Sequence, residues 1–439
     1  MFCKTAWKGL HILPDGYIRL CSIGANSKPE LDMQRCRDRD GNVMHILTHS
    51  IKDIMNSDKH REVRKLNVEN PLAWSPHCDC CETREIVTNF DKNHRNKSRR
   101  IYLMRVEDGL SDLDYADKIA DDGSVDWMPS SLDIRFGNLC NQKCIMCSPV
   151  YSNLWYDEHF DYYKTTSFGQ GKQIQVVRGD SGKWQNPPEL QWFEDPRWWA
   201  KFEEMIPHLR HIYITGGEPM VTPAHDTMLD MIIDSGHAKN IWLEYDTNGS
   251  AVNDKIAQRW FNFKSVHVRV SMDGINDTYE LIRFPGKWNK FTENVKKLQE
   301  YQTQSSGKIQ VQAMSSCFQI STMFSVIDNE NWCKANGLNF HLRFLEGPDF
   351  HSVASLPDFA KLELIEYFSK NTETSEKAGM IVKYLQLHLG VDNLPAISEF
   401  VKFMDYLDTT RGTQWKDIIP GTADLISRTL STMINKTNQ

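Results

Sequence analysis

The stretch "GNLCNQKCIMCSP", residues 137–149 and here called the cysteine loop, places Cys140, Cys144 and Cys147 within eight positions. A disulfide, a zinc site and an iron–sulfur cluster are three uses for thiols at such spacing. The chain has eleven cysteines, an odd number, and its first residues do not form a signal peptide. It also has no apolar run of the length that a bilayer span needs. These features predict a cytoplasmic protein, whose reduced thiols favour metal ligation over disulfides.

The bulk composition narrows the class of protein. With 439 residues, the chain is long enough for two or three domains. Its 40% hydrophobic and 25% charged residues are typical of a folded globular protein. The net charge of −7 argues against a protein built mainly to coat nucleic acid.

The region after the acidic segment 107–126 alternates strand-like and helix-like stretches. Each strand-like run ends in glycine or polar turn residues, and helical stretches separate the runs. Such alternation predicts parallel pairing with right-handed crossovers, and we expect a partly closed (β/α)6 barrel rather than an open sheet. The six runs are SLDIRFGN (131–138), HIYITGG (211–217), NIWLEYDTNG (240–249), SVHVRVSMDG (265–274), KIQVQAMSS (308–316) and NFHLRFLEGP (339–348).

Changes in composition along the chain predict four parts. We expect a cysteine-rich N-terminal domain, a linker, a barrel domain with an aromatic-rich insertion after its first strand, and a helical C-terminal extension. An insertion of this length is usually functional, and it could close over the site as a lid. The alternative is that it adds core packing against the barrel. The expected ranges are 1–95, 96–130, 131–350 with the insertion at 151–200, and 351–439.

The cysteine loop directly follows the first predicted strand, and loops at the carboxyl ends of barrel strands form the reactive face. Three thiolates can hold three irons of a 4Fe–4S cube and leave the fourth iron open. A structural zinc ion needs a closed shell of four ligands, but the nearest histidine, His159, lies twelve residues beyond Cys147. The motif favours the open cluster, with zinc as the alternative.

The second predicted strand ends in "ITGGEP", residues 214–219. Gly216 and Gly217 allow the backbone to approach a ligand closely, and Glu218 can pair with an ammonium group. A tight turn with a surface glutamate is the alternative interpretation. The neighbouring cysteine loop favours a ligand site.

These motifs together resemble the radical SAM superfamily, in which C-x3-C-x2-C binds a 4Fe–4S cluster whose open iron chelates S-adenosylmethionine (SAM). The resemblance implies that Gly216, Gly217 and Glu218 receive the methionine amino group. It also implies that Ser271, in "VSMDG", contacts the ribose or carboxylate, and that Arg283 lies against the SAM carboxylate. In this family an electron donor such as flavodoxin or ferredoxin reduces the cluster, SAM is cleaved, and a 5′-deoxyadenosyl radical abstracts hydrogen from the substrate.

The N-terminal region carries a second set of cysteines. Cys3 and Cys21 flank a "PDG" turn, which predicts a hairpin that brings them together at its open end. After a helix-like stretch at 50–66 comes a C-x2-C pair, Cys78 and Cys81. Four thiolates from two pairs can close around zinc or around an iron–sulfur cluster.

This second pattern resembles the twitch domain, a shortened relative of the SPASM domain. The resemblance implies one auxiliary 4Fe–4S cluster held by Cys3, Cys21, Cys78 and Cys81. Cys80 is a possible substitute ligand, and Cys36 is left unassigned. In most relatives this module follows the barrel, whereas here it precedes it.

The expected function is radical modification or oxidation of a peptide or small metabolite. The alternatives are a radical enzyme that modifies nucleic acid, which the net charge disfavours, and a non-catalytic metal-cluster protein, which the intact motifs disfavour. The sequence does not identify a catalytic acid or base. Glu244, Asp246, Asp273 and Glu346 all lie at predicted strand ends.

Overall fold

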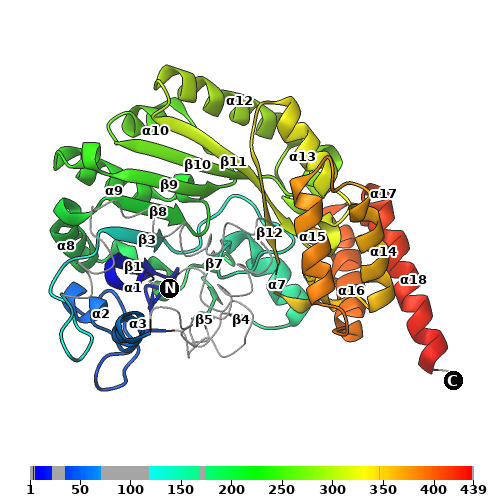
Figure 1. Ribbon diagram of the computed structural model, residues 1–439, viewed down its shortest axis with the longest axis horizontal. Coiled ribbons are helices and arrows are strands. Elements are labelled where there is room, and N and C mark those ends of the chain that lie inside the picture. The colour runs from blue at the N-terminus through cyan, green and yellow to red at the C-terminus, as the bar shows by residue number, and fades with distance from the viewer. Residues whose placement is uncertain are drawn as a thin grey trace.

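The computed structural model describes residues 3, 5–21, 35–70, 118–168, 174–345 and 347–437. All six predicted strands are present and pair in parallel, in chain order, as Figure 1 shows. The prediction of a parallel α/β barrel sheet is therefore confirmed. The strands are β3 (Ser131–Arg135), β8 (His211–Thr215), β9 (Trp242–Thr247), β10 (Ser265–Ser271), β11 (Ile309–Phe318) and β12 (Phe340–Phe344).

The N-terminal hairpin, β1 (Gly9–Ile12) and β2 (Ile18–Arg19), extends this sheet beyond β3. Among the described residues the main sheet has eight strands, in the order β12-β11-β10-β9-β8-β3-β1-β2. Strand β1 runs parallel to β3, with Gly9 opposite Ser131 and Ile12 opposite Ile134. The turn after β1 therefore lies at the same edge as the cysteine loop. The sequence predicted the hairpin but not its pairing with the barrel.

The two faces of the sheet have different environments. Along β10 the valines are buried, whereas His267, Arg269 and Ser271 on the other face are partly exposed. Because side chains alternate along a strand, one face packs on helices and the other lines the barrel interior. Helices along the outer side of the sheet (Figure 1) are α9 (Pro223–Asp234), α10 (Asp254–Trp260), α12 (Trp288–Gln304) and α13 (Val326–Ala335).

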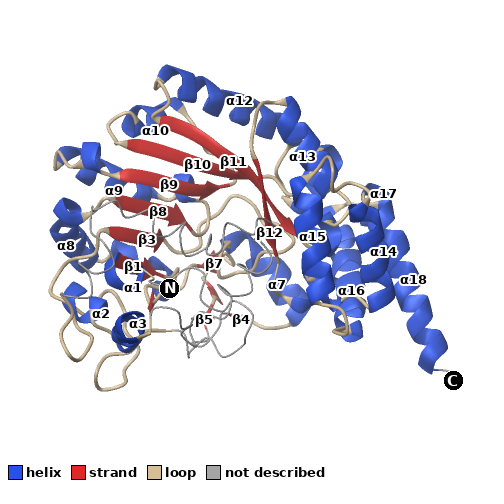
Figure 2. Cartoon of the chain, viewed as in Figure 1, coloured by secondary structure: helices blue, strands red, loops and turns tan. Residues whose placement is uncertain are grey.

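The C-terminal extension is helical, as predicted, and packs at the β12 end of the sheet (Figure 2). Its longest helices are α16, which Gly412 ends with a φ of 68°, and α18, whose end projects away from the body in the figure. The helices are α14 (Asp358–Ser369), α15 (Glu376–Leu387), α16 (Leu394–Arg411), α17 (Trp415–Ile418) and α18 (Pro420–Thr437).

The N-terminal region beside β1 is also helical. The helix-like stretch 50–66 forms two helices rather than one, α2 (Ile51–Met55) and α3 (Asp58–Glu69). Ser57 breaks the stretch because its side chain accepts a hydrogen bond from the amide of His60 and caps α3. A short helix, α1 (Thr5–Lys8), leads into β1.

The aromatic insertion adds core packing and also borders the site described below. Trp192 and Trp198 are buried in the main core, and Trp192 Nε1 donates to Pro14 O at 3.0 Å. The insertion thereby joins the barrel to the N-terminal hairpin. It contains α7 (Tyr156–Tyr163), the first half of α8 (Pro196–Met205) and two antiparallel strand pairs, β4 (Ser167–Phe168) with β5 (Ile174–Gln175) and β6 (Val177–Arg178) with β7 (Trp184–Gln185). In the part of the chain that the structure describes, no helix is long and apolar enough to span a membrane.

Candidate active site

The cysteine loop leaves β3 at the carboxyl edge of the sheet and is held from two sides. Lys143 N donates to Phe284 O at 2.7 Å, so the segment after helix α11 (Asn276–Ile282) fixes the middle of the loop. Ser152 Oγ, at the start of the insertion, donates to Gln142 O at 2.6 Å. These hydrogen bonds therefore fix the backbone position of the loop that carries the three thiols.

Burial controls the ionisation of these thiols. It raises the pKa of Cys140 to about 12 and is also the main reason for the raised pKa of Cys144 and of Cys147. The other two cysteines raise the pKa of Cys147 further, because neighbouring thiolates repel one another. Since the thiolate is the ligand form, a metal centre bound here must displace these protons.

The spacing of the thiols bears on the zinc alternative. Four ligands around one tetrahedral zinc ion lie roughly 3.8 Å from one another, given Zn–S bonds of about 2.3 Å. Within the described residues, no three Cys, His, Asp or Glu side chains gather closely enough to hold one metal ion. The three thiols nevertheless interact with one another electrostatically. Three neighbouring thiols on one loop are the kind of donor set that a 4Fe–4S cluster uses.

The two glycines of "ITGGEP" allow the end of β8 to pack directly against the cysteine loop. Gly216 has a φ of 126°, which favours glycine. A Cβ on Gly217 would lie 2.1 Å from Leu139 O, so the position excludes any side chain. Glu218 N then donates to the same oxygen at 2.8 Å. The glycines thus allow the backbones of the two motifs to lie in direct contact.

Glu218 itself is buried, with 1% of its surface exposed, so it is not a surface turn residue. One carboxylate oxygen accepts from Thr247 Oγ1 at 2.6 Å and the other from Asn248 N at 2.7 Å. Burial raises the pKa of Glu218, and these hydrogen bonds oppose that rise. A carboxylate has about four acceptor sites, so it can receive a further ammonium donor.

The other two predicted SAM contacts lie at the same edge of the sheet. Ser271 ends β10 and pairs with Ser315 of β11. Arg283 donates from Nε to Asp273 at 2.8 Å, and its Nη1 lies 3.7 Å from Cys144 Sγ. Arg283 therefore faces the cysteines while it is ion-paired. Its contact with the SAM carboxylate stays a prediction.

Charged residues line the barrel interior next to this edge. Arg269 Nε and Arg343 Nη2 each lie 2.6 Å from an oxygen of Asp246, and Tyr213 donates to the same carboxylate. Burial acts to raise the pKa of Asp246, but the two arginines outweigh it and hold the pKa well below the usual range. Asp246 is thus the shared counter-ion of Arg269 and Arg343. Glu346 lies outside the described residues.

A cavity of about 620 Å³ opens beside Cys147, and we call it the cysteine-loop cavity. Its walls come from the N-terminal hairpin turn, the insertion and the C-terminal extension. Since these segments are far apart in the chain, no local spacing could have predicted the cavity. Its lining includes Pro14, Asp15, Arg35, Trp155, His159, His351 and Phe403.

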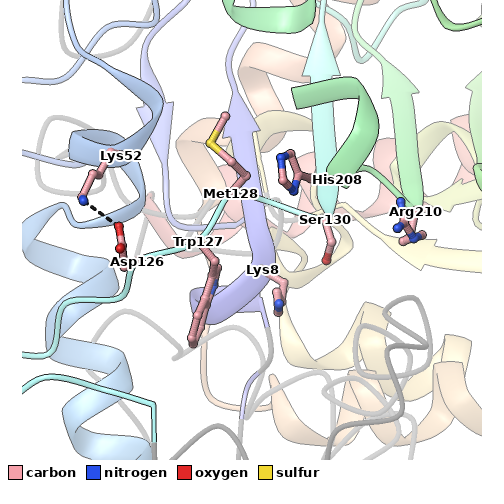
Figure 3. A pocket seen from close by; sticks show the side chains of 8 residues that line it. All are labelled: Lys8, Lys52, Asp126, Trp127, Met128, Ser130, His208 and Arg210. Carbon is pink, nitrogen blue, oxygen red and sulfur yellow. Dashed lines mark ion pairs between the residues drawn. The ribbon is translucent and has the colours of Figure 1, made fainter. Parts of the chain in front are cut away.

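A second cavity, of about 470 Å³, lies at the opposite edge of the sheet and is shown in Figure 3. Lys8, His208 and Arg210 line it, and Lys52 Nζ makes an ion pair with Asp126 at 2.5 Å. None of the predicted site residues borders this cavity. This cavity is therefore not the site that the cysteine loop and the Gly-Gly-Glu turn predict.

Of the four predicted N-terminal ligands, the structure describes two. Cys3 and Cys21 are half-buried, whereas the predicted ligands Cys78 and Cys81, and also Cys80, lie outside the described residues. The assignment of all four ligands stays a prediction. Cys36 is buried 3.8 Å from His60 Nδ1, and burial raises its pKa to about 12, which is the behaviour of an inert core thiol.

The fold and the site define an α/β barrel protein with a three-thiol site at its carboxyl edge. The sequence profile of the radical SAM superfamily matches residues 134–309, and that of the SPASM iron–sulfur cluster-binding domain matches residues 3–82. Residues 134–309 thus form a radical SAM domain and residues 3–82 a SPASM domain, as the resemblance predicted. A radical SAM domain uses a 4Fe–4S cluster and SAM, and a SPASM domain carries auxiliary iron–sulfur clusters.

Solved structures give weaker matches. The protein anSMEcpe with bound AdoMet and Cp18Cys peptide is 16% identical; the match covers 55% of this chain and 60% of that one, with a TM-score of 0.35. SuiB from Streptococcus suis is 13% identical, with 72% and 63% covered and a TM-score of 0.36. This chain thus spans about 60% of the length of these structures. None of the curated proteins matches it.

Proposed function

We propose that this chain is a radical SAM enzyme that modifies or oxidises a peptide or small-metabolite substrate in the cysteine-loop cavity. The observation that carries the proposal is the hydrogen bond from Glu218 N to Leu139 O. It joins the end of β8 directly to the cysteine loop. The three thiols and a buried carboxylate thereby belong to one site, with the cavity alongside.

In this proposal Cys140, Cys144 and Cys147 hold a 4Fe–4S cluster. When bound, the cluster supplies the electron that cleaves SAM into methionine and a 5′-deoxyadenosyl radical. The protein contributes binding and orientation: Glu218 accepts the methionine ammonium group, which Gly216 and Gly217 allow to approach. The remaining predicted contacts of SAM are those of Ser271 and Arg283.

The cavity walls suit an extended substrate with apolar groups. Volumes of about 300–1,000 Å³ are usual for small-molecule sites, and the aromatic lining excludes water from the reacting centre. At its rim Tyr151 and Tyr163 are 39% and 45% exposed, so they can contact a substrate that continues outside. The insertion serves here as a wall of the site.

The N-terminal domain completes the proposal. Cys3, Cys21, Cys78 and Cys81 hold one auxiliary 4Fe–4S cluster, which serves as an electron acceptor or conduit. A flavodoxin or ferredoxin supplies the electron for SAM cleavage. An enzyme with such a donor and reduced thiols works in the cytoplasm.

The test is SAM cleavage by anaerobically reconstituted protein with dithionite as reductant. The wild type should contain about eight irons, at four per cluster, and should form 5′-deoxyadenosine. The triple variant Cys140→Ala, Cys144→Ala, Cys147→Ala should lose half of the iron and all of the product. Cys333→Ala, which removes a buried thiol far from the cysteine loop in sequence, is the control and should keep both. Zinc in place of iron, or no product from the wild type, would refute the proposal.

A further inference from the structure

The last residue of helix α16, Arg411, is joined to the cysteine loop through a carboxylate of the insertion. Its Nη2 and Nε lie 2.6 and 3.1 Å from the carboxylate of Glu158, on helix α7 of the insertion. The same carboxylate lies 2.6 Å from Nζ of Lys143, which directly precedes Cys144. The cysteine loop, the insertion and the C-terminal extension therefore meet in one ionic cluster beside a predicted iron ligand.

This cluster is buried and carries a net positive charge. The exposed fractions of the Arg411 and Glu158 side chains are 2% and 6%, and that of Lys143 is 21%. Two cations share one carboxylate. Such an arrangement is costly in a low-dielectric interior unless a further negative charge is nearby. Arg411 Nη1 also has no hydrogen-bond partner in the part of the chain described.

Ring packing holds the guanidinium beside the segment that hydrogen-bonds to the cysteine loop. The Arg411 guanidinium lies 4.8 Å from the ring centre of Trp155 and 5.0 Å from that of Phe284. Phe284 follows Arg283, and its carbonyl accepts from Lys143 N.

We infer that Arg411 is a positioning residue that stabilises the reduced state of the cluster on Cys140, Cys144 and Cys147. Reduction adds one electron, supplied by the external donor, and therefore one negative charge. A fixed positive charge lowers the free energy of that added charge, and more strongly in a buried site than in water. Glu158 moderates the effect and links Arg411 to Lys143. The inference rests on the proposed function, because it requires the cluster.

The test is a redox titration of the loaded cluster, followed by electron paramagnetic resonance in the absence of substrate. Arg411→Gln removes the charge, so the ratio of reduced to oxidised cluster at a fixed potential should fall about tenfold, a downward shift of about 59 mV in midpoint potential. Glu158→Gln removes the moderating carboxylate, and the midpoint should rise. Arg411→Lys keeps the charge and should stay near the wild type.

The matched control is Arg428→Gln. Arg428 makes a similar two-bond pair with Glu363, at 2.7 and 2.8 Å, but on the exposed surface of the same extension. Its midpoint should equal that of the wild type. Unchanged midpoints in Arg411→Gln and Glu158→Gln, or shifts of both in the same direction, would overturn the inference. If Arg411→Gln fails to load, Glu158→Gln against Arg411→Lys decides. Failure of the proposed function is distinct, because then the wild type itself holds no cluster.

Discussion

The two cysteine regions of this protein join the same sheet but are built differently. In the cysteine loop, the three predicted ligands lie on one short segment that follows β3. In the N-terminal region, Cys3 and Cys21 stand at the two ends of a hairpin, and their predicted partners Cys78 and Cys81 lie much later in the chain. The first site needs only one loop to be held in place. The second needs separate parts of the chain to come together.

The largest expected difference between the regions is catalytic. With Cys3→Ala and Cys21→Ala combined, the protein should lose about four of eight irons yet still form 5′-deoxyadenosine with dithionite. This is because the predicted ligands of the SAM-binding cluster are untouched. Iron analysis and product chromatography on one sample check the result. Loss of all product from this variant would show that the two regions do not act separately.

The N-terminal strand should nevertheless stabilise the barrel. Leu10 is fully buried on β1, opposite Leu132 of β3. Leu10→Ala should lower the free energy of unfolding by about 2–5 kcal/mol, because it removes buried contacts and leaves a cavity. Denaturant unfolding, followed by tryptophan fluorescence, measures the change. A single transition, shifted as a whole, is expected if hairpin and barrel unfold together; two transitions would separate them.

At the shared edge of the sheet, Glu218→Gln should weaken SAM binding. The substitution keeps the size of the side chain but removes the charge that is proposed to receive the methionine ammonium group. A hydrogen bond to a charged group contributes about 1.5–3 kcal/mol, so the dissociation constant should rise roughly 10- to 100-fold. Calorimetry on cluster-loaded protein measures it. Glu293→Gln, on an exposed helical surface, is the control and should bind SAM as the wild type does.

The smallest effect concerns acid stability of the N-terminal region. Burial lowers the pKa of His11 to about 4 and that of His60 to about 3. Between these values and the unfolded pKa of about 6.5, the unfolded chain binds protons that the folded chain excludes. Stability should therefore fall as the pH falls, by about 1.4 kcal/mol per histidine at pH 5.5. In unfolding measurements at pH 7 and pH 5.5, His11→Gln should reduce this loss.

Much of the barrel could be predicted because its signals are local. Each strand is predicted by an alternating or apolar run that ends in glycine or polar residues. All six predicted strands are present. The stretch 50–66 shows where local reasoning fails. Its apolar spacing predicted one helix, but the capping hydroxyl of Ser57 starts a second helix within it. Periodicity does not report a cap in the middle of a periodic run.

The sequence by itself determined the family and its principal motifs, because the thiols of the cysteine loop and the Gly-Gly-Glu turn need fixed short spacings. Only the tertiary structure decided that β1 pairs with β3, which brings Pro14 and Asp15 to the cavity beside Cys147. It also decided that Arg411 and Glu158 meet next to Lys143. The contact between Arg411 and Glu158 joins residues 253 positions apart. Such pairings depend on how whole elements pack, and no local pattern records them.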